Sequence, residues 1–181
     1  GFWAYETLNW GGFWAWDPVE NASLVPWITF VGAGHVMMIN RKNGSSLMSS
    51  FLLVTATFIL ILYSTFLTRS GILGETSVHA FTDLGMTGQL VIYMAFFAVQ
   101  AGYLMFVNRK SFPKSEKEDS LFSREFWMFI GMLVLVVSSL QITFSTSIPV
   151  INKLFGTNMA PPADVIGYYN SWQVPFAVII C

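Results

Sequence analysis

The stretch LMSSFLLVTATFILILYSTFLT, from Leu47 to Thr68, contains no charged residue. As an α-helix it is long enough to cross a bilayer, whose hydrocarbon core needs about 20 apolar residues. It lacks the strict alternation of a membrane β-barrel strand and is too long for one, since such a strand needs about 10 residues. The stretch therefore predicts a transmembrane α-helix.

Three other uncharged stretches have a similar length. They run from Ala22 to Asn40, from Met86 to Asn108 and from Phe126 to Ile148. The apolar run from Trp172 to Cys181 is too short to span a bilayer, so we expect a truncated fifth span in a fragment of a longer chain. The predicted fold is all-α: a polytopic transmembrane helical bundle of four complete spans plus this truncated fifth.

Composition excludes several classes of protein. Only 10% of the residues are charged, whereas soluble proteins have about 25%, so membrane lipid is the expected surroundings. A net charge of −1 provides no basic surface for a nucleic acid. The single cysteine, Cys181, cannot form a disulfide or a CxxC pair within the chain. Any thiol chemistry must use thiols from a partner.

The positions of the cations predict the orientation, because Lys and Arg near span ends favour the cytoplasmic side. Arg41–Ser46 and Arg109–Arg124 are therefore expected inside, and residues 1–21, Arg69–Gly85 and Pro149–Ser171 outside. This divides the chain into an outward Trp-rich segment (1–27), spans one to three (22–108) with an outward loop (69–85), a cytoplasmic linker (109–125) and a last part (126–181) with span four, an outward loop and the truncated span.

The outward N-terminal segment is dense in tryptophan, with Trp3, Trp10, Trp14, Trp16 and Trp27 close together. On a helix, the first three would share one face, although two adjacent glycines weaken that helix. Such a face would be a flat apolar surface suited to a planar ligand. The alternative is an interfacial aromatic belt.

The sequence Asp17-Pro18-Val19-Glu20 is typical of a helix start. Asp17 is the predicted N-cap, Pro18 suits the first helical position, and Glu20 can complete a capping box. We therefore prefer a structural role for both acids over direct catalysis. No residue of the chain has the surroundings of an activated nucleophile or a general base.

The stretch WGGFWAWDPVENAS, which begins at Trp10, resembles the WWD signature of the haem-handling membrane proteins of cytochrome c maturation. With the later TRSG and SVHAF, the sequence is similar to the CcmF family and its NrfE-like relatives. This resemblance covers nearly the whole chain up to the third span and thins out after it. The CcmC and CcsA families share the Trp-rich segment but continue differently after the WD pair.

The chain has two histidines, His35 and His79. His35 lies within the first predicted span, where an ionisable side chain is usually functional; the alternative is a hydrogen bond to a neighbouring helix. His79 lies in the outward loop, where it is either solvated, or a metal ligand with Glu75 and Asp83 on one helical face, or a haem ligand. The two should lie more than about 20 Å apart along the membrane normal, so they cannot hold one iron.

The resemblance implies two haem sites. His35 matches a transmembrane His that ligates a resident b-type haem, and His79 matches an outward His that ligates the haem being delivered as substrate. Their second axial ligands are expected in segments beyond this chain. Trp10, Trp14 and Trp16 would contribute the flat surface at the outer site.

The resemblance also implies an activity, a location and a set of partners. The activity is a haem lyase reaction, in which two apocytochrome c CxxCH thiols add to the haem vinyl groups. It takes place on the periplasmic side of a bacterial inner membrane, together with a haem chaperone of the CcmE type, a thiol partner of the CcmH type and a quinol. Arg69 is placed either to pair with a haem propionate or to act as an interfacial anchor.

Two rival functions remain open. A haem exporter or loading platform of the CcmC type would share the Trp-rich segment without a resident haem at His35. A transporter or channel would use His35 as a proton relay and bind no haem.

Overall fold

The computed structural model describes residues 14–44, 46–74, 76–77, 79–81, 85–113 and 121–181. The described residues form helices and no strand, which confirms the predicted all-α fold. The helices are α2 (Pro18–Asn43), α3 (Leu47–Arg69), α4 (Thr87–Asn108), α5 (Arg124–Thr146), α6 (Ile148–Phe155) and α7 (Val165–Ile180).

The helices α2, α3, α4 and α5 are long and apolar enough to cross a membrane. They correspond to the four predicted complete spans, with boundaries that differ by a few residues. The fourth ends at Thr146 rather than at Ile148. Pro149 follows in the first turn of α6; it could not continue α5, because it lacks an N–H donor and its ring would clash with the carbonyl of the preceding turn.

The last helix begins earlier than the apolar run that predicted it. Asp164 caps α7 by accepting a 2.9 Å hydrogen bond from the Gly167 N–H, and the helix includes Tyr168 and Asn170 in the tail expected to be an outward loop. α6 also lies within that tail. Both helices are short and partly polar, so neither contains the long apolar run that predicts a transmembrane span.

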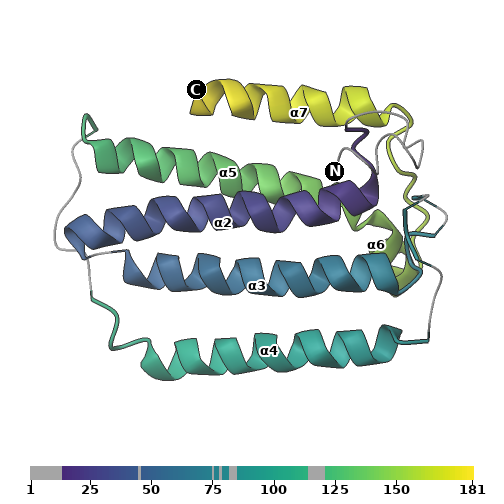
Figure 1. The fold of residues 1–181 in the computed structure, drawn as a ribbon, viewed down its shortest axis with the longest axis horizontal. Helices are drawn as coiled ribbons and strands as arrows, with labels where there is room; N and C mark the ends of the chain where they lie inside the picture. The colour runs from purple at the N-terminus through teal and green to yellow at the C-terminus, as the bar shows by residue number, and fades with distance from the viewer. Residues whose placement is uncertain (1–13, 45, 75, 78, 82–84, 114–120) are drawn as a thin grey trace, which may run out of the picture.

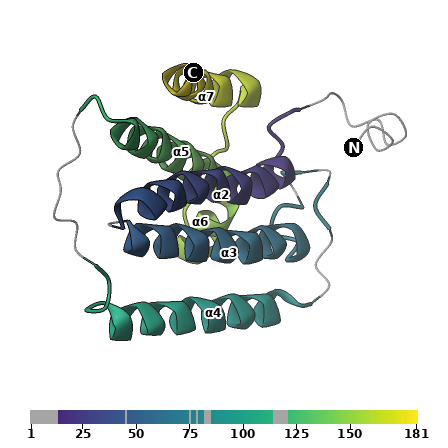
Figure 2. The same cartoon turned by 60° about the vertical axis from the view of Figure 1, so that its left-hand side comes forward.

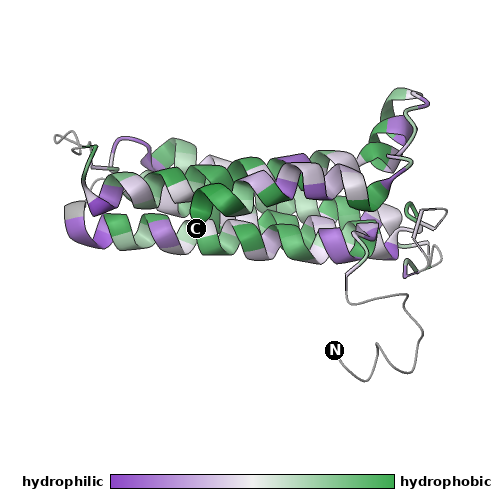
Figure 3. Ribbon diagram, turned by 90° about the horizontal axis from the view of Figure 1, so that it is seen from above, coloured by the Kyte–Doolittle hydropathy of each residue, from purple (hydrophilic) through white to green (hydrophobic). Residues whose placement is uncertain are grey.

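The helices lie side by side in the order α7, α5, α2, α3, α4, and two views agree on this order (Figures 1 and 2). α2 is central and packs against both α5 and α3. Hydrophobic residues, coloured green, recur along the long helices (Figure 3), and α4 has no buried residue. Two buried clusters hold the central helices together: one contains Ala22, Phe66, Leu67 and Leu73, and the other Val25, Ile28, Ile142 and Tyr169.

The charged residues favour one end of the helices. Lys42, at the end of α2, forms an ion pair with the buried Glu125 at the start of α5. Arg41, Lys42, Arg109, Lys110 and Arg124 lie at this end, to the left in Figure 1, where α2 and α4 finish and α3 and α5 begin. At the opposite end the described cations are Arg69 and Lys153.

We expect Ala160 outside the cell membrane and Ser111 inside, because the cation-rich end favours the cytoplasm. Both residues are exposed. In a Cys181→Ser background, a membrane-impermeant maleimide should label Ala160→Cys in spheroplasts and Ser111→Cys only after permeabilisation. The reverse pattern would invert the topology.

Candidate functional site

The candidate site begins at the first turn of α2. The Asp17 side chain accepts a 2.9 Å hydrogen bond from the Val19 N–H, and the Glu20 carboxylate accepts one of 3.2 Å from the Asp17 N–H. This is the predicted capping box, with Pro18 at the start of the helix. Asp17 is thereby fixed to the end of a long, rigid helix.

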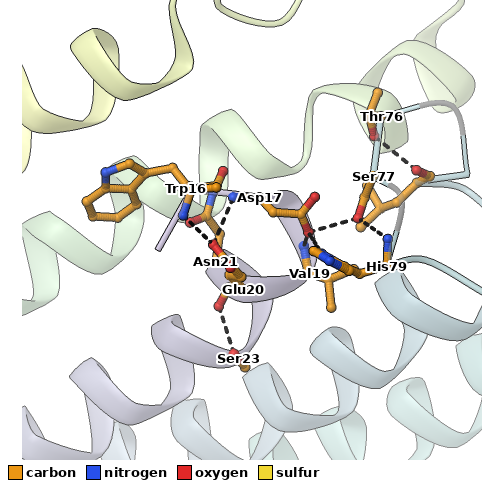
Figure 4. Close-up of polar contacts among 11 residues, drawn as sticks. Trp16, Asp17, Val19, Glu20, Asn21, Ser23, Thr76, Ser77 and His79 are labelled. Atoms are coloured by element: carbon orange, nitrogen blue, oxygen red, sulfur yellow. Dashed lines mark hydrogen bonds and ion pairs between the residues drawn. The ribbon is translucent and has the colours of Figure 1, made fainter. Parts of the chain in front are cut away.

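Asp17 also contacts the loop that follows α3. Its Oδ1 accepts a 2.8 Å hydrogen bond from the Ser77 hydroxyl and lies 3.3 Å from Nδ1 of His79. The His79 N–H donates to Ser77 Oγ at 3.1 Å. Figure 4 shows Ser77 and His79 approaching Asp17 from one side while Trp16 points away from it. The WDPVEN and SVHAF sequences therefore meet in space.

The loop that carries His79 is anchored to α3 and to the core. Leu73 is fully buried, and its carbonyl accepts 2.9 Å hydrogen bonds from the Thr76 and Ser77 N–H groups. The Phe81 N–H donates to the Thr68 carbonyl at 3.1 Å, which returns the chain to the end of α3. His79 is held between these two attachments.

The rival metal site of Glu75, His79 and Asp83 falls partly outside the described residues, which include neither acid. Among the residues that the structure does describe, no group of three His, Cys, Asp or Glu side chains could hold a metal ion. That hypothesis therefore stays a prediction without support from the described geometry.

Arg69 ends α3 close to this loop. Its guanidinium lies over the Phe81 ring, 4.0 Å from the ring centroid. The side chain is exposed, and no described carboxylate lies within ion-pair distance. An aromatic ring thus positions the planar cation, whose N–H groups can bind an anion.

Trp16 joins the Trp-rich segment to α7. Its ring stacks on Tyr169 with a centroid distance of 5.0 Å, and its Nε1–H donates to Asn170 Oδ1 at 3.0 Å. Its φ of 56° is unusual for a bulky residue. The fully buried Asn21 donates a 3.0 Å hydrogen bond to the Trp16 carbonyl and helps to hold this conformation.

Trp14 keeps more of its surface accessible. It contacts Trp16 edge to face at 5.7 Å and is 38% exposed. It precedes α2 in a non-helical segment, so the predicted helical face that included Trp14 is wrong for this residue. Trp3 and Trp10 lie outside the described residues.

A cleft of about 200 Å³ adjoins Trp16 at this end of the helices. The α2 start, the loop before α7 and the end of α5 form its walls. Its lining residues are Trp16, Pro18, Thr76, Ser145, Thr146, Pro149, Pro161, Pro162, Val165 and Tyr169.

We expect Trp16→Ala to destabilise the packing of α7 by about 2 kcal/mol, because it removes a stacked aromatic pair and one hydrogen bond. Thermal unfolding in detergent measures the change. Trp14→Ala is the matched control and should cost less, since the ring contact that Trp14 makes within the described part of the chain is edge to face. Equal losses would show that Trp16 has no special role in holding α7.

His35 lies well inside α2, far from the Asp17 cluster. Its Nδ1 is 2.8 Å from the Val31 carbonyl one turn earlier. Among the described residues, its ring forms no hydrogen bond to a neighbouring helix, which one interpretation of the sequence expected. A carbonyl only accepts, so Nδ1 carries the hydrogen and Nε2 carries the lone pair of the neutral ring. His35 is half-buried and adjacent to the exposed Gly34, where an added Cβ would meet nothing within 4 Å.

The two histidines lie at different levels of the bundle. His79 contacts Asp17 at the start of α2, and the helical path from Asp17 to His35 is about 27 Å at 1.5 Å of rise per residue. One iron cannot bind both side chains, which agrees with the prediction from sequence.

Comparison with known proteins identifies similar sequences. A family model described as "Cytochrome C assembly protein" matches residues 1–74. CcmF of Escherichia coli K12 is 32% identical over 98% of this chain and 28% of its own length. CcmF of Pseudomonas fluorescens is 38% identical over 96% of this chain and 26% of its own length, and CycK of Bradyrhizobium diazoefficiens is 36% identical over 99% and 27%.

All three relatives are described as cytochrome c-type biogenesis proteins. The chain spans about a quarter of their length. The similarity reaches past the third span, where the resemblance seen in the sequence thinned out. No solved structure matches.

Proposed function

We propose that this chain, which is similar over nearly its whole length to CcmF and CycK proteins of cytochrome c biogenesis, is the haem-handling part of a cytochrome c haem lyase. It acts as a multi-pass protein of a bacterial inner membrane. Its Asp17 end faces the periplasm, as the cation distribution favours.

The observation that carries this proposal is the contact between Asp17 and His79. It joins the Trp-rich segment to the one outward histidine of the chain. A histidine whose Nδ1–H faces a carboxylate presents Nε2 as its electron-pair donor, an arrangement common among metal-ligating histidines. His79 is therefore suited to bind the iron of a delivered haem.

The surroundings of His79 suit the remainder of the substrate. Trp14 offers a partly exposed aromatic ring for the porphyrin plane, with Trp10 as a further contributor outside the described residues. Trp16 has one ring face occupied by Tyr169, so its proposed contact with haem is by the edge. Arg69 lies at the same end and can pair with a propionate.

His35 fits a second, resident b-type haem. Its Nδ1–H is engaged by its own helix, which leaves Nε2 as the ring's donor, and the bare backbone at Gly34 allows a flat ring to approach. When bound, this haem would supply electrons that keep the delivered iron reduced. The second axial ligand of each haem is proposed to come from outside the described residues.

In the proposed reaction, two apocytochrome thiols add across the two haem vinyl groups. Each addition forms one carbon–sulfur bond and places the thiol hydrogen on the other vinyl carbon. The protein's part is to hold and orient the haem. We propose a CcmE-like chaperone as haem donor, a CcmH-like partner that presents the thiols, and a quinol as reductant.

A maturation assay tests this proposal. In cells that lack their own CcmF-type protein, the full-length protein should restore covalent attachment of haem to a reporter apocytochrome, seen as haem stain after denaturing electrophoresis. Haem export without covalent attachment would contradict the lyase and support a loading platform. Proton flux without any bound haem would support the transporter.

A further inference from the structure

We propose that Asp17 is a positioning residue for His79, and that its charge, beyond its role as a helix cap, sets the strength of the bond from His79 to haem iron. This inference rests on the proposed function, because it assumes that His79 ligates the delivered haem. It assigns to Asp17 a role in controlling the bond from His79 to iron, in addition to capping α2.

One oxygen of Asp17 connects the cap to the histidine. Oδ1 accepts the Val19 N–H at 2.9 Å and the Ser77 hydroxyl at 2.8 Å, and it lies 3.3 Å from His79 Nδ1. A carboxylate oxygen only accepts, so its approach to the ring is favourable when Nδ1 carries a hydrogen. Asp17 thereby selects the tautomer that directs the Nε2 lone pair away from the cap.

The charge on Asp17 acts at short range. The side chains of Asp17 and His79 are 12% and 14% exposed, so little water screens their interaction. The carboxylate also lies at the N-terminus of α2, which is the positive end of the helix dipole. A carboxylate that accepts from the ring makes the imidazole a stronger electron donor to iron, which stabilises ferric over ferrous haem.

The geometry of the ring is fixed from two sides. The His79 N–H donates to Ser77 Oγ at 3.1 Å, and Ser77 in turn donates to Asp17. Glu20 accepts from the Asp17 N–H at 3.2 Å and so fixes the acid to α2. The ligand is therefore aligned by a helix that also carries His35, and its position does not depend on the loop alone.

Asp17→Asn separates the two roles of this side chain. Asn is nearly as good an N-cap as Asp, and its amide oxygen can still accept from Val19 and Ser77. The charge that faces His79 is lost. Asp17→Ala removes the cap as well as the charge, so it is expected to affect both stability and haem binding.

The matched control is Asp164→Asn. Asp164 caps α7 by accepting from the Gly167 N–H at 2.9 Å, and neither of the ion pairs among the described residues involves it. This variant removes a cap charge at the same end of the molecule without changing the surroundings of His79.

The experiment measures the affinity for added ferric haem, the midpoint potential and the melting temperature in the full-length protein. The haem binding that is lost in His79→Ala is assigned to the outer site. We expect Asp17→Asn to weaken this binding by about 10- to 100-fold and to raise the midpoint potential, with little change in melting temperature, while Asp164→Asn leaves affinity and potential as in the wild type.

Each other outcome has a distinct meaning. Wild-type affinity and potential in Asp17→Asn would overturn the positioning role and leave Asp17 as a helix cap, while the loss in His79→Ala would still support the proposed function. If His79→Ala removes no haem, the proposed outer site is wrong and the role of Asp17 is overturned with it. Equal effects of Asp17→Asn and Asp164→Asn would point to a general cap effect and would also overturn the inference.

Discussion

Replacing His79 by alanine is expected to reduce cytochrome c maturation at least about 10-fold, because it removes the proposed axial ligand of the delivered haem. The measurement is haem stain on a reporter cytochrome, normalised to the amount of the variant protein in the membrane. The resident haem proposed at His35 should remain, since the helical path from Asp17, beside His79, to His35 is about 27 Å.

A structural role for His79 has to be separated from ligation. His79→Gln is suited to this, because an amide N–H can still donate to Asp17 while the side chain offers iron no imidazole nitrogen. We expect His79→Gln to lose maturation as His79→Ala does. Normal maturation in His79→Gln would show that the histidine serves the loop and not the iron.

The sequence predicts the long helices well because their signal is local. An uncharged run of span length, such as Leu47–Thr68, needs no knowledge of its neighbours to be recognised. The start of α2 was equally local, since the cap and the capping box lie within four consecutive residues from Asp17. The start of α7 at Val165 was missed, because its first turns contain tyrosine, asparagine and serine and read as a loop.

The site itself could be predicted only in parts. The sequence predicts Asp17 as a helix N-cap. The family resemblance implies that His79 is an outward haem ligand. Their contact joins residues about 60 positions apart, and no pattern within a helix or a loop encodes such a distance. The same limit explains Trp16: its φ of 56° and its stack on Tyr169 depend on α7, an element whose start was not recognised.

His35 differs from His79 in that its described geometry lies within one helix. Its proposed function depends on the haem that binds there. If His35 holds the proposed b-type haem, we expect His35→Ala to lower the haem that co-purifies with the full-length protein at least about 10-fold, since it removes the proposed ligand of the iron. The reduced absorption spectrum and the haem content per protein measure this loss. His79→Ala is the matched control and should retain this haem.

His35→Phe then distinguishes ligation from packing. Among the described residues, the His35 ring forms a hydrogen bond only within its own helix, to Val31 at 2.8 Å. Its loss should therefore cost about 1 kcal/mol and leave α2 intact. Phe restores the bulk of the side chain at this position without a donor atom. We expect His35→Phe to lose the haem as His35→Ala does. Its haem-free form should melt as the haem-free wild-type protein does. Retention of the reduced spectrum in His35→Phe would make His35 a packing residue, and the electrons for the delivered haem would have to come by another route.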